Sequence, residues 1–198
     1  MNASDPDGLR LPVDLPFAEA SPPPALFLLD SRKHGHRHAG RVIVLGCALL
    51  GRTGRWPEGP RLWASAYLHD LARVDDGHDR EHGARAAERL DSLPEVLALF
   101  RRAGLGDADL AAVKFAVTHH VGRPEPPMDH PYGPLTALLK DADGLDRVRL
   151  EDLDVRLLRY PESPGLVPFA ERLLAASREL PSGPGHFEAL WLRARDLG

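Results

Sequence analysis

Cysteine and long apolar runs are scarce in this sequence of 198 residues. The single cysteine, Cys47, has no partner for an intrachain disulfide, and its apolar neighbours predict a small buried side chain in a reducing compartment. No segment has the apolar length that a membrane span needs, and residues 1–7 are polar and acidic, unlike a signal peptide. The sequence therefore predicts a cytoplasmic protein that does not contact membranes.

A surplus of positive charge is missing as well. The formal net charge is −4, so the chain has no long-range attraction for nucleic-acid phosphates or anionic lipids, although a local basic pocket is compatible with it. We therefore exclude long nucleic acids as partners. Hydrophobic residues at 43% and charged residues at 27% are typical of a soluble globular protein, and the length suits one domain. The composition leaves the oligomeric state open.

Period-two alternation of apolar and polar residues, which would indicate strands, is absent. Apolar residues instead recur at helical spacing from Leu26 onward, between clusters of Gly, Pro and Asp. We expect an all-α, single-domain helical bundle over residues 26–198, preceded by a flexible, proline-rich arm over residues 1–25. The expected helices cover residues 35–51, 61–73, 80–92, 94–103, 107–121, 133–142, 150–159, 165–178 and 184–196.

Histidine, by contrast, is abundant. Most of the ten histidines fall into three clusters, and carboxylates lie close to them in the sequence. Imidazole is the commonest protein ligand of metal ions, and a carboxylate beside it balances the charge of a divalent ion. The clusters are His34, His36 and His38; His69, His78 and His82; and His119 and His120.

Helical periodicity selects one histidine of the first cluster. His38 shares a stripe with Val42 and Leu45, whereas His36 lies about 200° away around the helix. We therefore expect His38 to point inward and His36 outward, with His34 at the rim. The alternative for each is a solvated or otherwise satisfied histidine.

The pair His69-Asp70 ends an apolar segment over residues 62–71 that predicts a buried helix. A buried carboxylate needs a cation, and a metal reached by both side chains must lie off the edge of this helix. Alternatively, Asp70 caps a neighbouring helix or pairs with Arg73 or Arg41.

Periodicity also selects between two aspartates further along the chain. Asp141 shares a stripe with Ala137 and Leu145, whereas Asp143 is rotated away from it. We therefore expect Asp141 to be the inward carboxylate. The alternative is that both aspartates are solvated at the end of a helix.

His119 and His120 close a predicted helix, and both can face partly inward. The alternative is a polar pair at a helix C-terminus, where positive charge is favourable. In the second cluster His78 and His82 have a spacing that suits a metal, but the turn over residues 76–79 interrupts the helix. We therefore favour His82 over His78.

In the order His38, His69-Asp70 and Asp141, the chain resembles the signature of the HD superfamily, helical proteins that place H…HD…D around a divalent metal. The similarity spans residues 30 to 150, and its segments look like a small stand-alone bacterial branch of that superfamily. The resemblance implies that these four residues are the metal ligands. One position departs from it: several nucleotidases of the superfamily carry an acid three residues after HD, where this chain has Arg73.

The resemblance implies a metal-dependent phosphohydrolase that attacks a nucleotide or other small phosphoester with a metal-activated water. The divalent metal would be Mn, Fe, Co, Ni, Mg or Zn, and a second ion would share the carboxylate of Asp70. The residues expected in catalysis, or in holding a second ion, are Asp70, His82, His119 and His120. The cations expected to bind a substrate phosphate, for which a solvated surface role is the alternative, are Lys114, Arg73 and Arg147.

Two other functions stay open at this point. Some proteins of the HD fold use a paired iron site for oxidation, so a di-iron oxygenase is one alternative. The other is a non-catalytic helical module in which the ion only holds the helices together.

Overall fold

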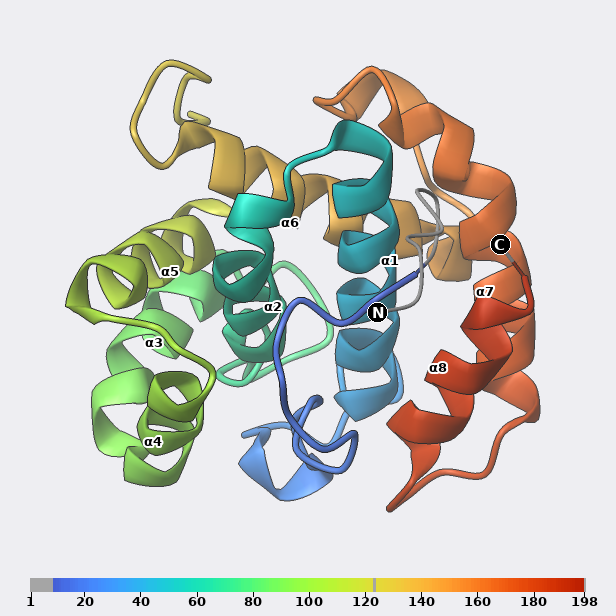
Figure 1. Cartoon of the computed structure of the whole chain (residues 1–198), viewed down its shortest axis with the longest axis horizontal. Helices are drawn as coiled ribbons and strands as arrows, with labels where there is room; N and C mark the ends of the chain where they lie inside the picture. Colours follow the sequence, from blue (N-terminus) through green and yellow to red (C-terminus); the bar gives the residue numbers. More distant parts are fainter. Residues whose placement is uncertain (1–8, 123, 198) are drawn as a thin grey trace, which may run out of the picture.

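The computed structural model describes residues 9–122 and 124–197, and these form one domain of eight packed α-helices without a strand. Short 3-10 helices (η) supplement them. Figure 1 labels the α-helices, which are α1 His36–Thr53, α2 Gly59–Leu68, α3 His82–Arg89, α4 Pro94–Arg102, α5 Asp107–His119, α6 Gly133–Leu145, α7 Val167–Glu179 and α8 His186–Arg195. The all-α prediction is confirmed.

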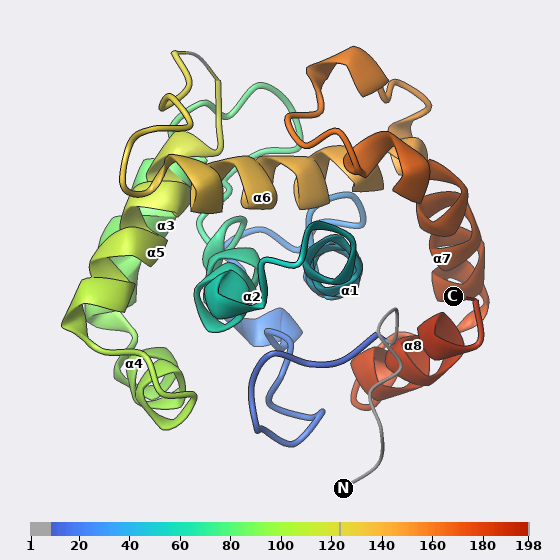
Figure 2. The ribbon, with the colours of Figure 1, turned by 45° about the horizontal axis from the view of Figure 1, so that its top comes forward.

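The helices α1 and α2 form the centre of the molecule. Figure 2 shows them nearly end-on, with α6 crossing over them, α3, α4 and α5 on one side, and α7 and α8 on the other. From His38 to Leu50, α1 is buried at all but one position, and it packs against α2, α6, α7 and α8.

Helix α1 begins after Gly35 and is followed by Gly54, which adopts a left-handed conformation with φ of 67°. This C-terminal glycine fits because it has no Cβ to clash in that conformation. Helix α2 carries Pro60 in its first turn, where the missing N–H costs no helical hydrogen bond. It ends at Leu68 rather than at residue 73, so His69 and Asp70 follow the helix.

The predicted helix over residues 150–159 is wrong. The chain forms two short 3-10 helices there, η4 Asp146–Leu150 and η5 Val155–Leu157, with Glu151 in a left-handed conformation between them. The backbone N–H groups of Arg159 and Tyr160 donate to a side-chain carboxylate of α6 instead of to helical carbonyls. This competition for donors is a tertiary effect, so helical periodicity could not reveal it.

Part of the proline-rich N-terminal segment lies within the described part of the chain. Residues 9–25 lie against the core, with Val13 and Ala20 buried. The indole N–H of Trp63 donates to the carbonyl of Ala20 at 2.8 Å. Proline prevents a long helix here without preventing packing. The first eight residues of the predicted arm lie outside the described part of the chain.

Within the described part, no helix has both the length and the apolarity required to cross a membrane.

Candidate metal centre

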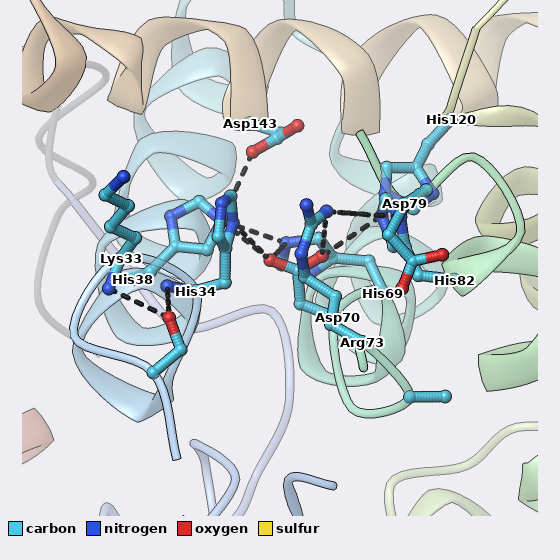
Figure 3. A network of polar contacts seen from close by, with 12 residues as sticks. Lys33, His34, His38, His69, Asp70, Arg73, Asp79, His82, His120 and Asp143 are labelled. Carbon is cyan, nitrogen blue, oxygen red and sulfur yellow. Dashed lines mark hydrogen bonds and ion pairs between the residues drawn. The ribbon is translucent and has the colours of Figure 1, made fainter. Parts of the chain in front are cut away.

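A cluster of imidazoles and carboxylates lies where the start of α1 and the end of α2 meet α3, α5 and α6 (Figure 3). Its side chains form three overlapping groups, in each of which the nitrogen and oxygen atoms lie within 4.8 Å of one another. The first group is His34, His38 and Asp70; the second is His38, His69 and Asp143; the third is Asp70, His82 and His120. Asp70 belongs to two groups and lies at the centre of the cluster.

His38, in the first turn of α1, is held in one orientation. Its Nδ1 donates to Oδ2 of Asp146 at 2.7 Å, and Asp146 also pairs with Arg41. The other ring nitrogen, Nε2, faces Oδ1 of Asp143 at 3.2 Å and Oδ2 of Asp70 at 3.4 Å. A carboxylate behind a histidine is the usual arrangement for orienting a metal ligand.

The next three histidines are oriented by backbone carbonyls. Nδ1 of His69 donates to Ala66 at 2.8 Å, and Nδ1 of His120 donates to Val117 at 2.6 Å. Nδ1 of His82 donates to the backbone carbonyl of Asp79, which lies before α3. Because a carbonyl only accepts, each Nδ1 carries the hydrogen, and the neutral form of each ring has its lone pair on Nε2.

These Nε2 atoms face one another in pairs. The distance is 3.2 Å between His38 and His69, and 3.1 Å between His82 and His120. Two neutral imidazoles in these orientations present lone pair to lone pair, which is unfavourable unless positive charge comes between them or beside them. A proton or a metal ion supplies that charge, and a metal ion can accept both lone pairs at once. The donor set therefore fits a divalent metal.

The carboxylate of Asp70 divides its oxygens between the two pairs. Oδ2 lies 3.1 Å from His34 and 3.7 Å from His69, and Oδ1 lies 3.1 Å from His82. Burial raises the pKa of Asp70, but His69 and the hydrogen bonds from neighbouring imidazoles outweigh it and hold this pKa well below its usual range. Asp70 is thus an ionised carboxylate with one oxygen facing each pair.

The pKa of His38 shows how much negative charge surrounds it. Burial and the nearby Arg149 lower this pKa, but three carboxylates outweigh them and raise it to about 9. These carboxylates belong to Asp143, Asp146 and Asp70. Without metal, His38 therefore carries a proton at neutral pH, in the place that a metal ion would take.

His120 has the opposite character. Burial, together with His69 and His82, lowers its pKa to about 3. His120 is therefore neutral at pH 7 and presents its Nε2 lone pair to His82. A neutral imidazole is the form that binds metals.

Arg73 lies beside the third group. Its Nη1 is 3.6 Å from Oδ1 of Asp70 and 3.3 Å from Nε2 of His82, and its Nη2 donates to the carbonyl of Gly77 at 2.9 Å. Only 7% of Arg73 is exposed. This guanidinium already supplies positive charge to the His82 side of the cluster, whereas no guanidinium pairs with the imidazoles of His38 and His69 in the described part of the chain.

Asp141, the carboxylate expected to face inward, is buried, but the structure places Asp143 rather than Asp141 in the cluster. Asp141 is fully buried, but its carboxylate accepts hydrogen bonds from the backbone N–H groups of Arg159 and Tyr160 at 2.9 Å and from the hydroxyl of Ser163 at 2.6 Å. Asp143 lies in the cluster, although 32% of its side chain is exposed. The apolar stripe identifies the buried face of α6, whereas the cluster lies at its flank.

The other expected residues divide into two sets. The structure brings His38, His69, Asp70, His82 and His120 together, with Arg73 beside them. It places His119 outside the three groups, where its ring stacks on Phe115 and its Nδ1 donates to the Phe115 carbonyl. Lys114 pairs with Asp91 on the surface. Neither His119 nor Lys114 therefore takes the place expected for it, because α5 turns both away from the cluster.

Sequence periodicity missed three residues that the fold adds. His34, expected only at the rim, contacts Asp70, and Asp146 holds His38 and Arg41. Arg149 donates to the backbone carbonyl of Asp146 at 3.0 Å. The run of charged residues after α6 was the only sequence signal for Asp146 and Arg149, and it does not indicate which neighbour they meet.

A cavity of about 420 Å³ opens onto the cluster. Four guanidinium groups and four carboxylates line it, together with His82 and His120; they belong to Arg73, Arg80, Arg147 and Arg149, and to Asp70, Asp76, Asp79 and Asp143. Arg147 also pairs with Asp152 at the surface. An accessible cavity with cations at its wall can admit water and a small anion to the ligand cluster.

No family model, no curated protein and no solved structure matches this chain.

Proposed function

We propose that this protein is a metal-dependent phosphohydrolase that acts on a nucleotide or another small phosphoester. The observation that carries the proposal is the Asp70 cluster, in which oriented imidazoles and ionised carboxylates open onto a cavity with arginines at its wall. The order of these residues along the chain also resembles the HD superfamily, with Asp143 in the fourth position. An open cavity favours a catalytic site over a closed structural one.

One divalent ion is the occupancy that the arrangement supports best. His38, His69, Asp143 and Oδ2 of Asp70 would hold it. When bound, such an ion activates water and neutralises charge on a phosphoryl group. On the other side of Asp70, Arg73 contacts Oδ1 and His82 and occupies the neighbourhood of a second ion.

The side chains around the ion have separate tasks. Asp146 fixes the ring of His38, and the carbonyl of Ala66 fixes the ring of His69. The two Nε2 atoms therefore face one another at 3.2 Å. Arg147 and Arg149 line the open cavity, where guanidinium groups bind and orient phosphate oxygens. His82 lies within reach of Asp70, where it can exchange a proton with a water or a leaving group, and neutral His120 presents its lone pair to His82.

The test is hydrolysis of a panel of nucleoside mono-, di- and triphosphates, cyclic dinucleotides and alarmones with Mn, Co, Mg, Ni or Fe. We expect metal-dependent release of phosphate or of a nucleotide product from at least one class. The control is Asp143→Asn, which keeps the size of the side chain and removes its charge. Equal activity in wild type and Asp143→Asn, or activity that appears only with oxygen and iron, would contradict the proposal.

A further inference from the structure

A second and larger cavity lies on the other side of the segment that leads into α1. Its volume is about 640 Å³, which is in the range of cavities that bind small organic ligands. Lys33 and Gly35 line it, whereas His34 between them lines the metal cavity. Figure 3 shows the side chain of Lys33 on the side of His34 and His38 that faces away from Asp70. We call this second cavity the basic cavity.

Positive charge dominates the wall of the basic cavity. Six side chains carry it, those of Arg32, Lys33, Arg37, Arg41, Arg149 and Arg178, against one carboxylate, Asp30. The lining charge is therefore six minus one, or +5, in a chain whose net charge is −4. Such a concentration of one sign is not explained by composition and points to an anionic ligand.

Most of these cations lack a carboxylate partner. Arg41 and Arg149 share Asp146, but among residues 9–122 and 124–197 no ion pair involves Lys33, Arg37 or Arg178. Arg37 donates to the carbonyls of Ser177 and Leu180, which hold it in place without neutralising it. Burial and the nearby Arg41 lower the pKa of Arg37, as expected for a cation among cations. These cations therefore have room for an anionic partner.

Apolar side chains line another part of the cavity, beside the polar residues Ser31, His36 and Ser182. Phe27 and Leu29 precede α1, and Leu174 of α7 lies among the lining residues. Phe27 is half-buried and offers an aromatic ring to a planar group. A ligand that matches both walls has several negative charges and an apolar or aromatic part.

We infer that the basic cavity binds an organic polyphosphate of the nucleoside di- or triphosphate class. Its phosphates contact the cations of residues 33, 37 and 178, and its base lies against Phe27 and Leu174. This site is distinct from the metal centre and does not depend on the proposed hydrolysis. Arg149 and Leu150 line both cavities, so the two sites are neighbours.

The experiment is calorimetric titration of the full-length protein, as purified, with a non-hydrolysable ATP analogue, with tripolyphosphate and with adenosine. We expect the analogue to bind, tripolyphosphate to bind more weakly and adenosine to show no binding. Replacing Lys33 and Arg178 together with Ala should weaken binding of the analogue at least about tenfold, because two charged contacts are lost. Both side chains are exposed, so these changes leave the core intact.

The matched control is the double variant Arg193→Ala and Arg195→Ala, which removes the same charge from exposed positions of α8. It should bind the analogue as wild type does. Equal weakening in both double variants, or no binding to wild type, would overturn the inference. Asp70→Asn should keep the binding even where it abolishes hydrolysis. If Asp70→Asn abolishes binding and the double variant of Lys33 and Arg178 still binds the analogue, the ligand lies in the metal cavity. That result would also overturn the inference.

Discussion

Two aspartates of α6, two residues apart, have different tasks. Asp141 satisfies backbone donors of residues 159 and 160, and Asp143 faces His38. We predict that Asp143→Asn keeps the fold and loses about tenfold or more in metal affinity, as expected for a lost charged ligand. Asp141→Asn should instead lower the free energy of unfolding by about 2–4 kcal/mol, because a buried acceptor of several hydrogen bonds is altered.

The measurements are metal content by elemental analysis after dialysis against a fixed metal concentration, and chemical denaturation of both variants. Each variant serves as the control for the other. Loss of metal in Asp141→Asn with wild-type stability would reverse the assignment of the two residues.

The position of Arg73 leads to a prediction about the number of bound metal ions. Its guanidinium contacts the two atoms, Oδ1 of Asp70 and Nε2 of His82, that a second ion would need. We expect wild type to bind one equivalent of metal and Arg73→Ala to bind a second, since the competing cation is gone. Titration monitored by elemental analysis gives the stoichiometry. Arg80→Ala, at the wall of the same cavity, is the control and should stay at one equivalent.

The raised pKa of His38 predicts a pH dependence of the metal-free protein. In the folded state this pKa is about 9, above the ordinary value of 6.5 for histidine. Protonation of His38 therefore contributes stability that is fully present below pH 6.5 and is lost as the pH rises through 9. The loss amounts to at most about 3 kcal/mol.

Denaturation of chelator-treated protein between pH 6 and pH 10 measures it, with His38→Gln as the control. The difference in stability between wild type and His38→Gln should shrink as the pH rises. A difference that stays constant or grows toward pH 10 would contradict the raised pKa.

At the scale of elements, the close approach of α3 and α5 brings His82 to His120. Gly83 makes this approach possible: a methyl group there would overlap the carbonyl oxygen of Val117 and lie 3.1 Å from Nδ1 of His120. We predict that Gly83→Ala pushes the helices apart. Although alanine favours a helix over glycine by about 1 kcal/mol, the overlap should outweigh this gain and lower stability.

The measurements are the thermal midpoint and the histidine signals of the third group by NMR. Gly165→Ala is the matched control, because nothing lies within 4 Å of the added methyl group. A Gly83→Ala protein as stable as wild type, with unchanged His82 and His120 signals, would show that the approach tolerates a side chain.

Burial of an apolar face separates the predicted helices that form from the one that does not. Most predicted helices exist because each has an apolar face that is buried against the centre. The predicted helix at 150–159 is replaced by two 3-10 helices with the left-handed Glu151 between them. Val155 and Leu157 are exposed, so this segment has no buried apolar face, and Asp141 takes the N–H groups of Arg159 and Tyr160 at its end. Apolar spacing alone does not report such competition.

At the scale of the whole molecule, the candidate ligands come from α1, α3, α6 and the residues that follow α2 and α5. A bound ion would therefore connect elements far apart in the sequence. We predict that the metal raises the thermal midpoint. At a free metal concentration about 100 times the dissociation constant, the free energy of unfolding increases by about 2.7 kcal/mol. For a chain of this size that is on the order of 5–10 °C.

Thermal denaturation with metal and with chelator checks this prediction, and the Asp143→Asn variant is the control. Its midpoint should respond much less to metal. An equal rise in both proteins would indicate binding elsewhere on the molecule.

The all-α class could be predicted from the apolar spacing alone, and the resemblance of His38, His69-Asp70 and Asp141 to the HD signature suggested a buried metal cluster. Periodicity sufficed for the helical class because it reports which face of a helix is buried. The three-dimensional arrangement was needed to place Asp143 rather than Asp141 in the cluster. It also added His34, Asp146 and Arg149, and left His119 and Lys114 outside. These outcomes depend on which element lies opposite each side chain, and the spacing along one helix does not contain that information.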